Sequence, residues 1–96
     1  MLVWIIYDIC ETKKRTKVAK VCMKKGLIRV QKSVFLGNIN ETQLKSAVSE
    51  SESLIDKETD SVYIFPFCQE DFKKIQLLGV AFDKAFVNDE IKELFL

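Results

Sequence analysis

Histidine is absent from the 96-residue chain. This absence excludes a serine–histidine or cysteine–histidine nucleophile and any acid–base pair built on imidazole. Cys10, Cys22 and Cys68 are odd in number and form no C-x-x-C pair, so without histidine they do not predict a zinc site. We expect each cysteine to be a small buried hydrophobic residue. Any hydrolysis by this chain would therefore depend on carboxylates and a metal ion.

Long apolar runs are also missing. The first apolar run ends at Asp8 and no basic segment precedes it, so it is too short for a signal sequence or a membrane span. We therefore expect a cytoplasmic protein without membrane contact. The length supports one domain with one core.

Acidic residues are absent from residues 12–40, although the net charge of the whole chain is only +1. That segment carries nine lysines and arginines, whereas residues 1–11 carry a formal charge of −2 and residues 41–96 carry −6. A small domain polarised in this way presents a basic face, as expected of a protein that binds a polyanion.

The apolar run at residues 2–8 predicts a central strand packed on both faces, because it is rich in β-branched and aromatic side chains. Asp8 then lies where the strand leaves the sheet. A carboxylate there is costly unless it is solvated, acts as a cap or binds a cation. Taken alone, Asp8 is best explained as the cap of the following turn or helix, and a cation site is the alternative.

A helix is predicted from Thr12, as its cap, to about Lys25, with Gly26 as the terminating residue. At about 100° per residue, one narrow stripe of this helix consists of lysines. These are Lys13, Lys17, Lys20 and Lys24. The opposite side consists of Val18, Ala19, Val21, Cys22 and Met23. The simplest explanation of the lysines is a solvated outer face. Arg15 projects towards the apolar side near Asp8, where a guanidinium is expected to meet a carboxylate or a phosphate.

Residues 27–36 alternate between two faces and predict a second strand, long enough to bend into a hairpin. One face is apolar, with Ile28, Val30, Val34 and Leu36. The other face is mixed, with Arg29, Gln31, Ser33 and Phe35. Gly37-Asn38 predicts a turn.

The second half of the chain predicts a further helix and two strands. Asn40 and Gln43 form a capping box for a helix that continues to about Asp56, with Leu44, Ala47, Val48, Ser51, Leu54 and Ile55 on its inner side. Residues 61–65 predict a strand ended by Pro66. Residues 70–74 predict one helical turn, residues 75–82 a short final strand, and residues 88–90 the start of a short last helix.

This order predicts a ferredoxin-like α+β fold with an antiparallel sheet and both helices on one face. Trp4, Phe35, Tyr63 and Phe65 cannot all lie under two helices, so the uncovered sheet face needs a partner, and a symmetric homodimer is the simplest one. One Asp8 is a poor Mg²⁺ site, whereas two copies related by a dimer axis form a plausible one.

The sequence resembles the small CRISPR-associated endoribonuclease family of the spacer-acquisition pair. The matching segments run in order through residues 2–82 and include Tyr7-Asp8-Ile9, Lys14-Arg15, Lys17-Val18-Ala19-Lys20, Lys25-Gly26-Leu27, Arg29-Val30-Gln31, Ser33-Val34-Phe35, Gly37 and Asp60-Ser61-Val62-Tyr63-Ile64-Phe65-Pro66. Lys17 departs from the pattern, because some members carry arginine there, and a bidentate phosphate contact is then lost.

The resemblance implies a βαββαβ domain over residues 1–82 that forms a sheet-face homodimer, with the final strand near residues 75–80 added to the partner's sheet. It implies that Asp8 pairs with its copy and binds the catalytic metal. It also links Arg15, Arg29 and Phe35 to catalysis or substrate contact. Residues 83–96 match the variable tail of the family, and nothing is carried over to them.

Two functions are compatible with these features. The first is a Mg²⁺-dependent endonuclease that hydrolyses phosphodiester bonds in single-stranded RNA, double-stranded DNA or both. In it, paired Asp8 carboxylates hold the metal, and Arg15 and Arg29 stabilise the developing charge. The residues expected to bind nucleic acid are Lys13, Lys14, Arg15, Lys17, Lys20 and Lys24.

The second function is a non-catalytic DNA-binding scaffold, whose dimer bridges copies of the larger CRISPR-associated integrase during spacer acquisition. The tail residues Ile91, Leu94 and Phe95 would dock on the integrase or pack within their own chain. An RNA-recognition module is a weaker third interpretation, because the basic-glycine-aromatic consensus is absent from residues 61–67.

Overall fold

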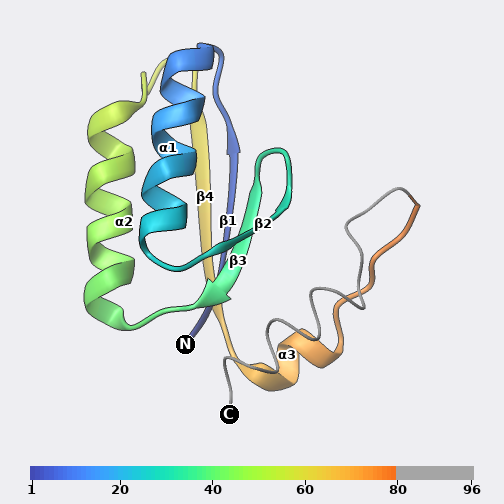
Figure 1. Cartoon of the computed structure of the whole chain (residues 1–96). Coiled ribbons are helices and arrows are strands. Elements are labelled where there is room, and N and C mark those ends of the chain that lie inside the picture. The colour runs from blue at the N-terminus through green and yellow to red at the C-terminus, as the bar shows by residue number, and fades with distance from the viewer. Residues whose placement is uncertain (80–96) are drawn as a thin grey trace.

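A computed structural model describes residues 1–79 and confirms the predicted element order. The elements are β1 (Leu2–Asp8), α1 (Thr12–Lys24), β2 (Ile28–Gln31), β3 (Val34–Asn38), α2 (Glu41–Leu54), β4 (Ser61–Phe67) and α3 (Gln69–Lys73). The four strands form an antiparallel sheet in the order β2-β3-β1-β4. Figure 1 shows α1 and α2 side by side on one face of this sheet. The fold is therefore the ferredoxin-like α+β fold with its helices on one face.

The core lies between the sheet and the two helices. Successive residues of a strand point to opposite faces, and Val3, Ile5 and Tyr7 of β1 point to the helices, where they are buried. They pack with Val18, Ala19 and Cys22 of α1, Ala47 of α2 and Phe35 of β3. Of the four aromatic residues that were predicted not to fit together under two helices, Phe35 is the one on the helix side, where its side chain is fully buried.

The other face of the sheet has no cover from α1 or α2. Trp4, Ile6 and Asp8 of β1 point to it, opposite Phe65, Tyr63 and Ser61 of β4. Ile6, Tyr63 and Phe65 are 36%, 54% and 48% exposed. We call the side chains of Trp4, Ile6, Tyr63 and Phe65 the open apolar face. A large apolar surface of this kind is typical of a protein interface.

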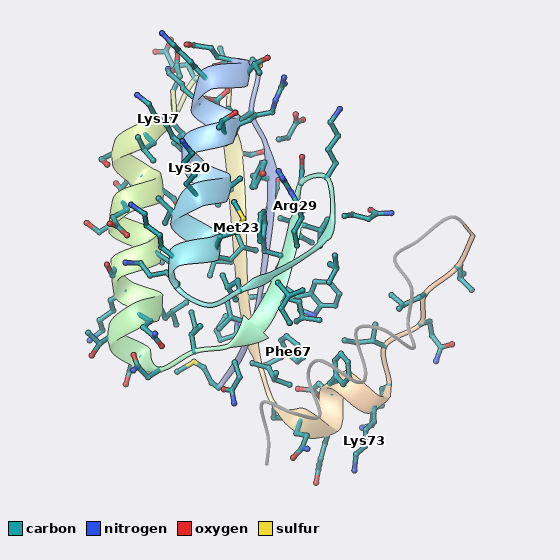
Figure 2. The ribbon with its side chains drawn as sticks, in the orientation of Figure 1. Lys17, Lys20, Met23, Arg29, Phe67 and Lys73 are labelled. Carbon is teal, nitrogen blue, oxygen red and sulfur yellow. The ribbon has the colours of Figure 1, made fainter. Side chains whose placement is uncertain are left out.

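One end of the uncovered side is closed by α3. Phe72 of α3 packs against a small cluster around the buried Leu2 and Leu36. The rings of Phe67 and Phe72 are 6.4 Å apart, and Figure 2 shows Phe67 next to the start of this helix. The end of the sheet that contains Asp8 lies opposite.

Residues 27–36 form a hairpin rather than one strand. The chain turns at Lys32 and Ser33, and the pairing register shifts between Arg29 and Gln31. The predicted division into two faces is right before the register shift, since Ile28 pairs with Leu36 and Arg29 with Phe35. It is wrong for Gln31, because the shift pairs Gln31 with Val34 on the opposite face.

Two predicted strand boundaries are wrong, and tertiary pairing explains both. Gly37 continues β3 opposite Val3, and a Cβ there would lie 2.9 Å from Leu27 Cδ2, so the glycine permits a close approach rather than a turn. Pro66 does not end β4. An edge strand tolerates a proline, and β4 continues through Pro66 to Phe67.

The predicted start of α2 is right, whereas the predicted cap of α1 and the predicted end of α2 are wrong. The Asn40–Gln43 capping box is present, with hydrogen bonds of 2.8 and 2.9 Å in the two directions. The cap of α1 is Glu11 rather than Thr12. The helix α2 ends at Leu54, two residues before the predicted end.

Four side chains predicted to be buried are exposed. Met23 and Val48 are 49% and 41% exposed, because α1 and α2 bury narrower stripes than their apolar residues suggest. Of the cysteines only Cys22 is buried, while Cys10 and Cys68 are exposed. Burial raises the pKa of Cys22 to about 12, so that thiol stays protonated at neutral pH.

Residues 75–79 do not form a strand in the single chain. A strand that pairs with a partner's sheet has no ladder partner within its own chain. The predicted strand residues 80–82 and the predicted helix near residues 88–90 lie outside the described residues. Within residues 1–79, no helix has the length and apolar character needed to cross a membrane.

Candidate metal and nucleic-acid site

Four segments meet at the end of the sheet that contains Asp8. The end of β1, the β2–β3 turn, the start of α1 and the start of β4 gather there (Figure 1). The backbone N–H of Tyr7 donates to the carbonyl of Ser33 at 3.1 Å, and Asp8 is in register with Ser61. This arrangement brings together parts of the chain that are far apart in sequence.

The Asp8 side chain is exposed and points to the same side as the open apolar face. Capping does not explain it, because the cap position of α1 belongs to Glu11. Among residues 1–79 no side chain or backbone group makes a hydrogen bond or ion pair with this carboxylate. Asp8 is therefore a carboxylate available to a ligand.

The chemistry of Asp8 fits Mg²⁺ only in part. Magnesium prefers oxygen ligands and is commonly bound by one or two carboxylates, together with water and substrate phosphates. The described part of the chain has no group of three or more histidine, cysteine or acidic side chains that could hold a metal ion. One chain supplies a single suitable carboxylate, so the other oxygen ligands of a magnesium ion would have to come from water, substrate phosphates or a second chain.

Arg15 lies near Asp8, as predicted, but its partners are neutral. Its Nη1 donates to the carbonyls of Ile9 and Cys10 at 3.0 and 3.4 Å, and its Nη2 donates to the hydroxyl of Thr12 at 2.7 Å. The expected carboxylate contact is absent from the described residues. Arg15 instead ties the first turn of α1 to the loop after β1.

Arg29 and Phe35 form a cross-strand pair. The guanidinium carbon of Arg29 is 5.3 Å from the centre of the Phe35 ring, a cation–π distance. Arg29 is exposed, and Phe35 lies fully buried beneath it. Phe35 therefore cannot touch a substrate in this structure, and its effect on a site would pass through Arg29.

Arg15 and Arg29 share a small polar pocket of about 250 Å³. It is lined by Tyr7, Thr12, Arg15, Thr16, Arg29, Lys32 and Ser33. Three cations and four hydroxyls without a carboxylate suit a phosphate group. Figure 2 shows Arg29 between α1 and the β2–β3 hairpin.

The sequence-predicted residues thus divide between two sides of one sheet end. Arg15 and Arg29 line the pocket on the helix side, whereas Asp8 points to the open side. Thr12, Lys32 and Ser33 were not predicted as part of a site. The sequence pointed to these residues only through their positions. Thr12 follows the strand that ends at Asp8, and Lys32 and Ser33 form the turn between β2 and β3.

The lysines of α1 form a separate basic surface. We call Lys13, Lys17, Lys20 and Lys24 the lysine stripe, and all four are exposed. None of them forms an ion pair with a described residue, whereas Lys14 lies 4.0 Å from Glu11 and Lys25 lies 2.9 Å from Glu50. Lys17 and Lys20 extend from α1 in Figure 2. The stripe is free to bind phosphates or to remain solvated.

Asp60 was not predicted as a functional residue. Its carboxylate accepts hydrogen bonds from the backbone N–H groups of Cys10 and Asp56 and from the Thr59 hydroxyl. These hydrogen bonds, above all the one from Cys10, lower the pKa of Asp60. A bond between loops far apart in sequence leaves no local sequence pattern.

Comparison with known families assigns the chain. The sequence model of the family described as CRISPR associated protein Cas2 matches residues 1–75. The chain belongs to the Cas2 family. This confirms the resemblance noted in the sequence.

Individual Cas2 proteins are similar over most of their length. The chain is 31% identical over 81 residues to CRISPR-associated endoribonuclease Cas2 2 of Chloroflexus aurantiacus, covering 84% of this chain and 95% of that protein. It is 42% identical over 84 residues to CRISPR-associated endonuclease Cas2 of Halalkalibacterium halodurans, covering 82% and 86%. Among solved structures, Streptococcus pyogenes Cas2 at pH 6.5 has a TM-score of 0.71 at 27% identity, covering 82% of this chain and 100% of that one.

Proposed function

We propose that this Cas2 protein is a Mg²⁺-dependent endonuclease that acts as a homodimer. The observation that carries the proposal is the Asp8 carboxylate, which is exposed and unpaired within the described residues at the end of a central strand. The names endoribonuclease and endonuclease of the two relatives support the same activity.

The open apolar face supports a second copy as the partner. Asp8 lies on the same side of the sheet as Ile6 and Tyr63, so a dimer that covers these side chains around a two-fold axis can bring the two Asp8 residues together. Each chain then contributes one carboxylate to a shared ion.

The roles of the other residues follow from their positions. A bound Mg²⁺ would polarise the scissile phosphate and supply an activated water. Arg29 points away from the Asp8 side, so we assign it to a phosphate next to the scissile one, with Phe35 supporting its guanidinium. The lysine stripe adds salt-dependent affinity along the strand.

Cleavage assays test the proposal directly. Labelled single-stranded RNA and duplex DNA are incubated with Mg²⁺ and wild type, Asp8→Asn or Asp56→Asn. We expect Asp8→Asn to lower cleavage at least about 100-fold, the usual scale for losing a key charge-stabilising group. Asp56→Asn removes the same charge from an exposed loop and should cleave as wild type does. Equal cleavage by wild type and Asp8→Asn would contradict the proposal.

The lysine stripe favours a second, compatible function as a DNA-binding scaffold that bridges CRISPR-associated integrase subunits. Each phosphate contact contributes about 0.9 to the slope of log affinity against log salt on duplex DNA. A Lys17→Gln/Lys20→Gln double variant should therefore reduce the steepness of that slope by about 2. Lys45→Gln, on α2, is the control. An unchanged slope would show that the lysine stripe does not bind DNA. If the double variant still assembles with the integrase as wild type does, the stripe has no role in bridging the integrase subunits.

A further inference from the structure

The loop after Asp8 is fixed by a carboxylate from a distant part of the chain. Asp60 precedes Ser61, the register partner of Asp8. Its Oδ1 accepts from the backbone N–H of Cys10 at 3.0 Å, and its Oδ2 accepts from the backbone N–H of Asp56 at 2.9 Å. The side chain of Asp60 therefore continues the β1–β4 pairing beyond its last backbone pair.

The same loop is held from its other side by Arg15. The guanidinium donates to the carbonyl of Cys10, whose N–H donates to Asp60, and also to the carbonyl of Ile9. Both contacts involve a charged group, which makes them stronger than hydrogen bonds between neutral groups. The backbone that follows Asp8 is thus tied to α1 on one side and to the start of β4 on the other.

We propose that Asp60 is a positioning residue for Asp8. By fixing Ile9 and Cys10, its carboxylate sets the direction in which the Asp8 side chain leaves the sheet. The inference rests on the proposed function, because this direction matters when Asp8 shares an ion with its copy. Site residues need to be held within about 0.5 Å of the productive geometry, and loss of an outer supporting contact typically costs about 10–100-fold in metal affinity.

A purely structural role for Asp60 makes a different prediction. Ile9 is 2% exposed and anchors the loop in the core by itself. If that anchor suffices, loss of Asp60 loosens Cys10 and lowers stability without any effect on Asp8.

The test compares Asp60→Asn with Asp56→Asn. Asparagine at position 60 keeps the size of the side chain. Its NH₂ group, which donates and cannot accept, would replace one of the two oxygens that accept from the backbone N–H groups of Cys10 and Asp56. The Asp56 carboxylate accepts from the backbone N–H of Glu58 at 2.9 Å and makes no contact with Cys10, so Asp56→Asn is a control for the lost charge. Asp60→Glu keeps the charge and displaces the carboxylate by one methylene.

Mn²⁺ binding is measured on the full chain from the electron paramagnetic resonance signal of the free ion. Amide exchange of Cys10 is measured by NMR without metal. We expect Asp60→Asn and Asp60→Glu to raise the half-saturating Mn²⁺ concentration about 10-fold and to accelerate exchange at Cys10. Asp56→Asn should match wild type in both.

Two results would overturn the inference, and they are distinguishable. If Cys10 exchanges faster in the Asp60 variants while Mn²⁺ binds as in wild type, Asp60 supports the loop but does not position Asp8. If Asp8→Asn binds Mn²⁺ as tightly as wild type does, the proposed metal site fails and the inference fails with it.

Discussion

Phe35 shows how burial changes the role of a single residue. Its strand position places it beside Arg29, which is consistent with a functional face, yet its ring is fully buried in the core. The exposed member of the pair, Arg29, is the one that can reach a phosphate. Variants of Phe35 should therefore be interpreted first as changes in stability.

The buried hydroxyl of Ser51 allows the cost of a single unpaired polar group to be measured. Its hydroxyl is buried between α2 and the core and has no hydrogen-bond partner among the described residues. A buried unpaired polar group costs about 1–3 kcal/mol, so Ser51→Ala should raise the free energy of unfolding by about 1 kcal/mol. Urea unfolding measures this, with the exposed Ser49→Ala as the control. Destabilisation by Ser51→Ala would show that the hydroxyl has a partner.

Among the elements, α1 and α2 are joined by an ion pair at one end. Lys25 Nζ lies 2.9 Å from Glu50 Oε2 and donates to the Ser46 hydroxyl at the same distance. The hydrogen bond from Lys25 holds the pKa of Glu50 below its ordinary value of 4.5. Glu50 is the more exposed partner, so the contribution to stability is small.

This ion pair predicts a pH dependence. Because the pKa of Glu50 is lowered in the folded state, its contribution is complete above about pH 4.5 and is lost as pH falls through the folded pKa. Glu50→Gln should therefore lower Tm at pH 7, and the difference from wild type should shrink below pH 4.5. Glu52→Gln, which breaks an exposed pair with Lys57, should have a smaller effect. A difference that grows on acidification would contradict the assignment.

Among the helices and strands, local sequence patterns predicted some features, and contacts between distant segments decided the others. The Asn40–Gln43 box and the alternation of residues 27–36 are local patterns, and both identified real features. Gly37, Pro66 and Asp60 depend on partners far away in the chain. Their roles as a close approach, an edge-strand residue and a loop contact become visible only when β3 and β4 lie against β1. Sequence reasoning located Asp8 for the site but not the pocket around Arg29, because that pocket combines β1, α1 and the hairpin turn.

Across the whole molecule, the two sides of the sheet differ in chemical character. The helix side carries the core and the basic side chains, while the other side carries the open apolar face and Asp8. This division separates the surface proposed for self-association from the lysine stripe proposed for nucleic acid, so one dimer can use both at once.

Self-association can be tested through Tyr63. The Tyr63 side chain is 54% exposed and its ring stacks on the exposed Phe65 ring, with centroids 6.2 Å apart, so a substitution at Tyr63 leaves the buried core intact. Tyr63→Glu should place a charge in the proposed dimer interface and convert the dimer to monomer in sedimentation equilibrium. Thr42→Glu, an exposed change on α2, should leave the dimer intact. A Tyr63→Glu protein that remains dimeric would exclude this face as the interface.

In the proposed dimer, Asp8 works as a pair, with one carboxylate from each chain. The stoichiometry of Mn²⁺ bound to the wild-type protein measures this most directly, with Asp8→Asn as the reference. We expect one bound ion for every two wild-type chains and no such ion in Asp8→Asn. One Asp8-dependent ion per chain, or binding unaffected by Asp8→Asn, would contradict it.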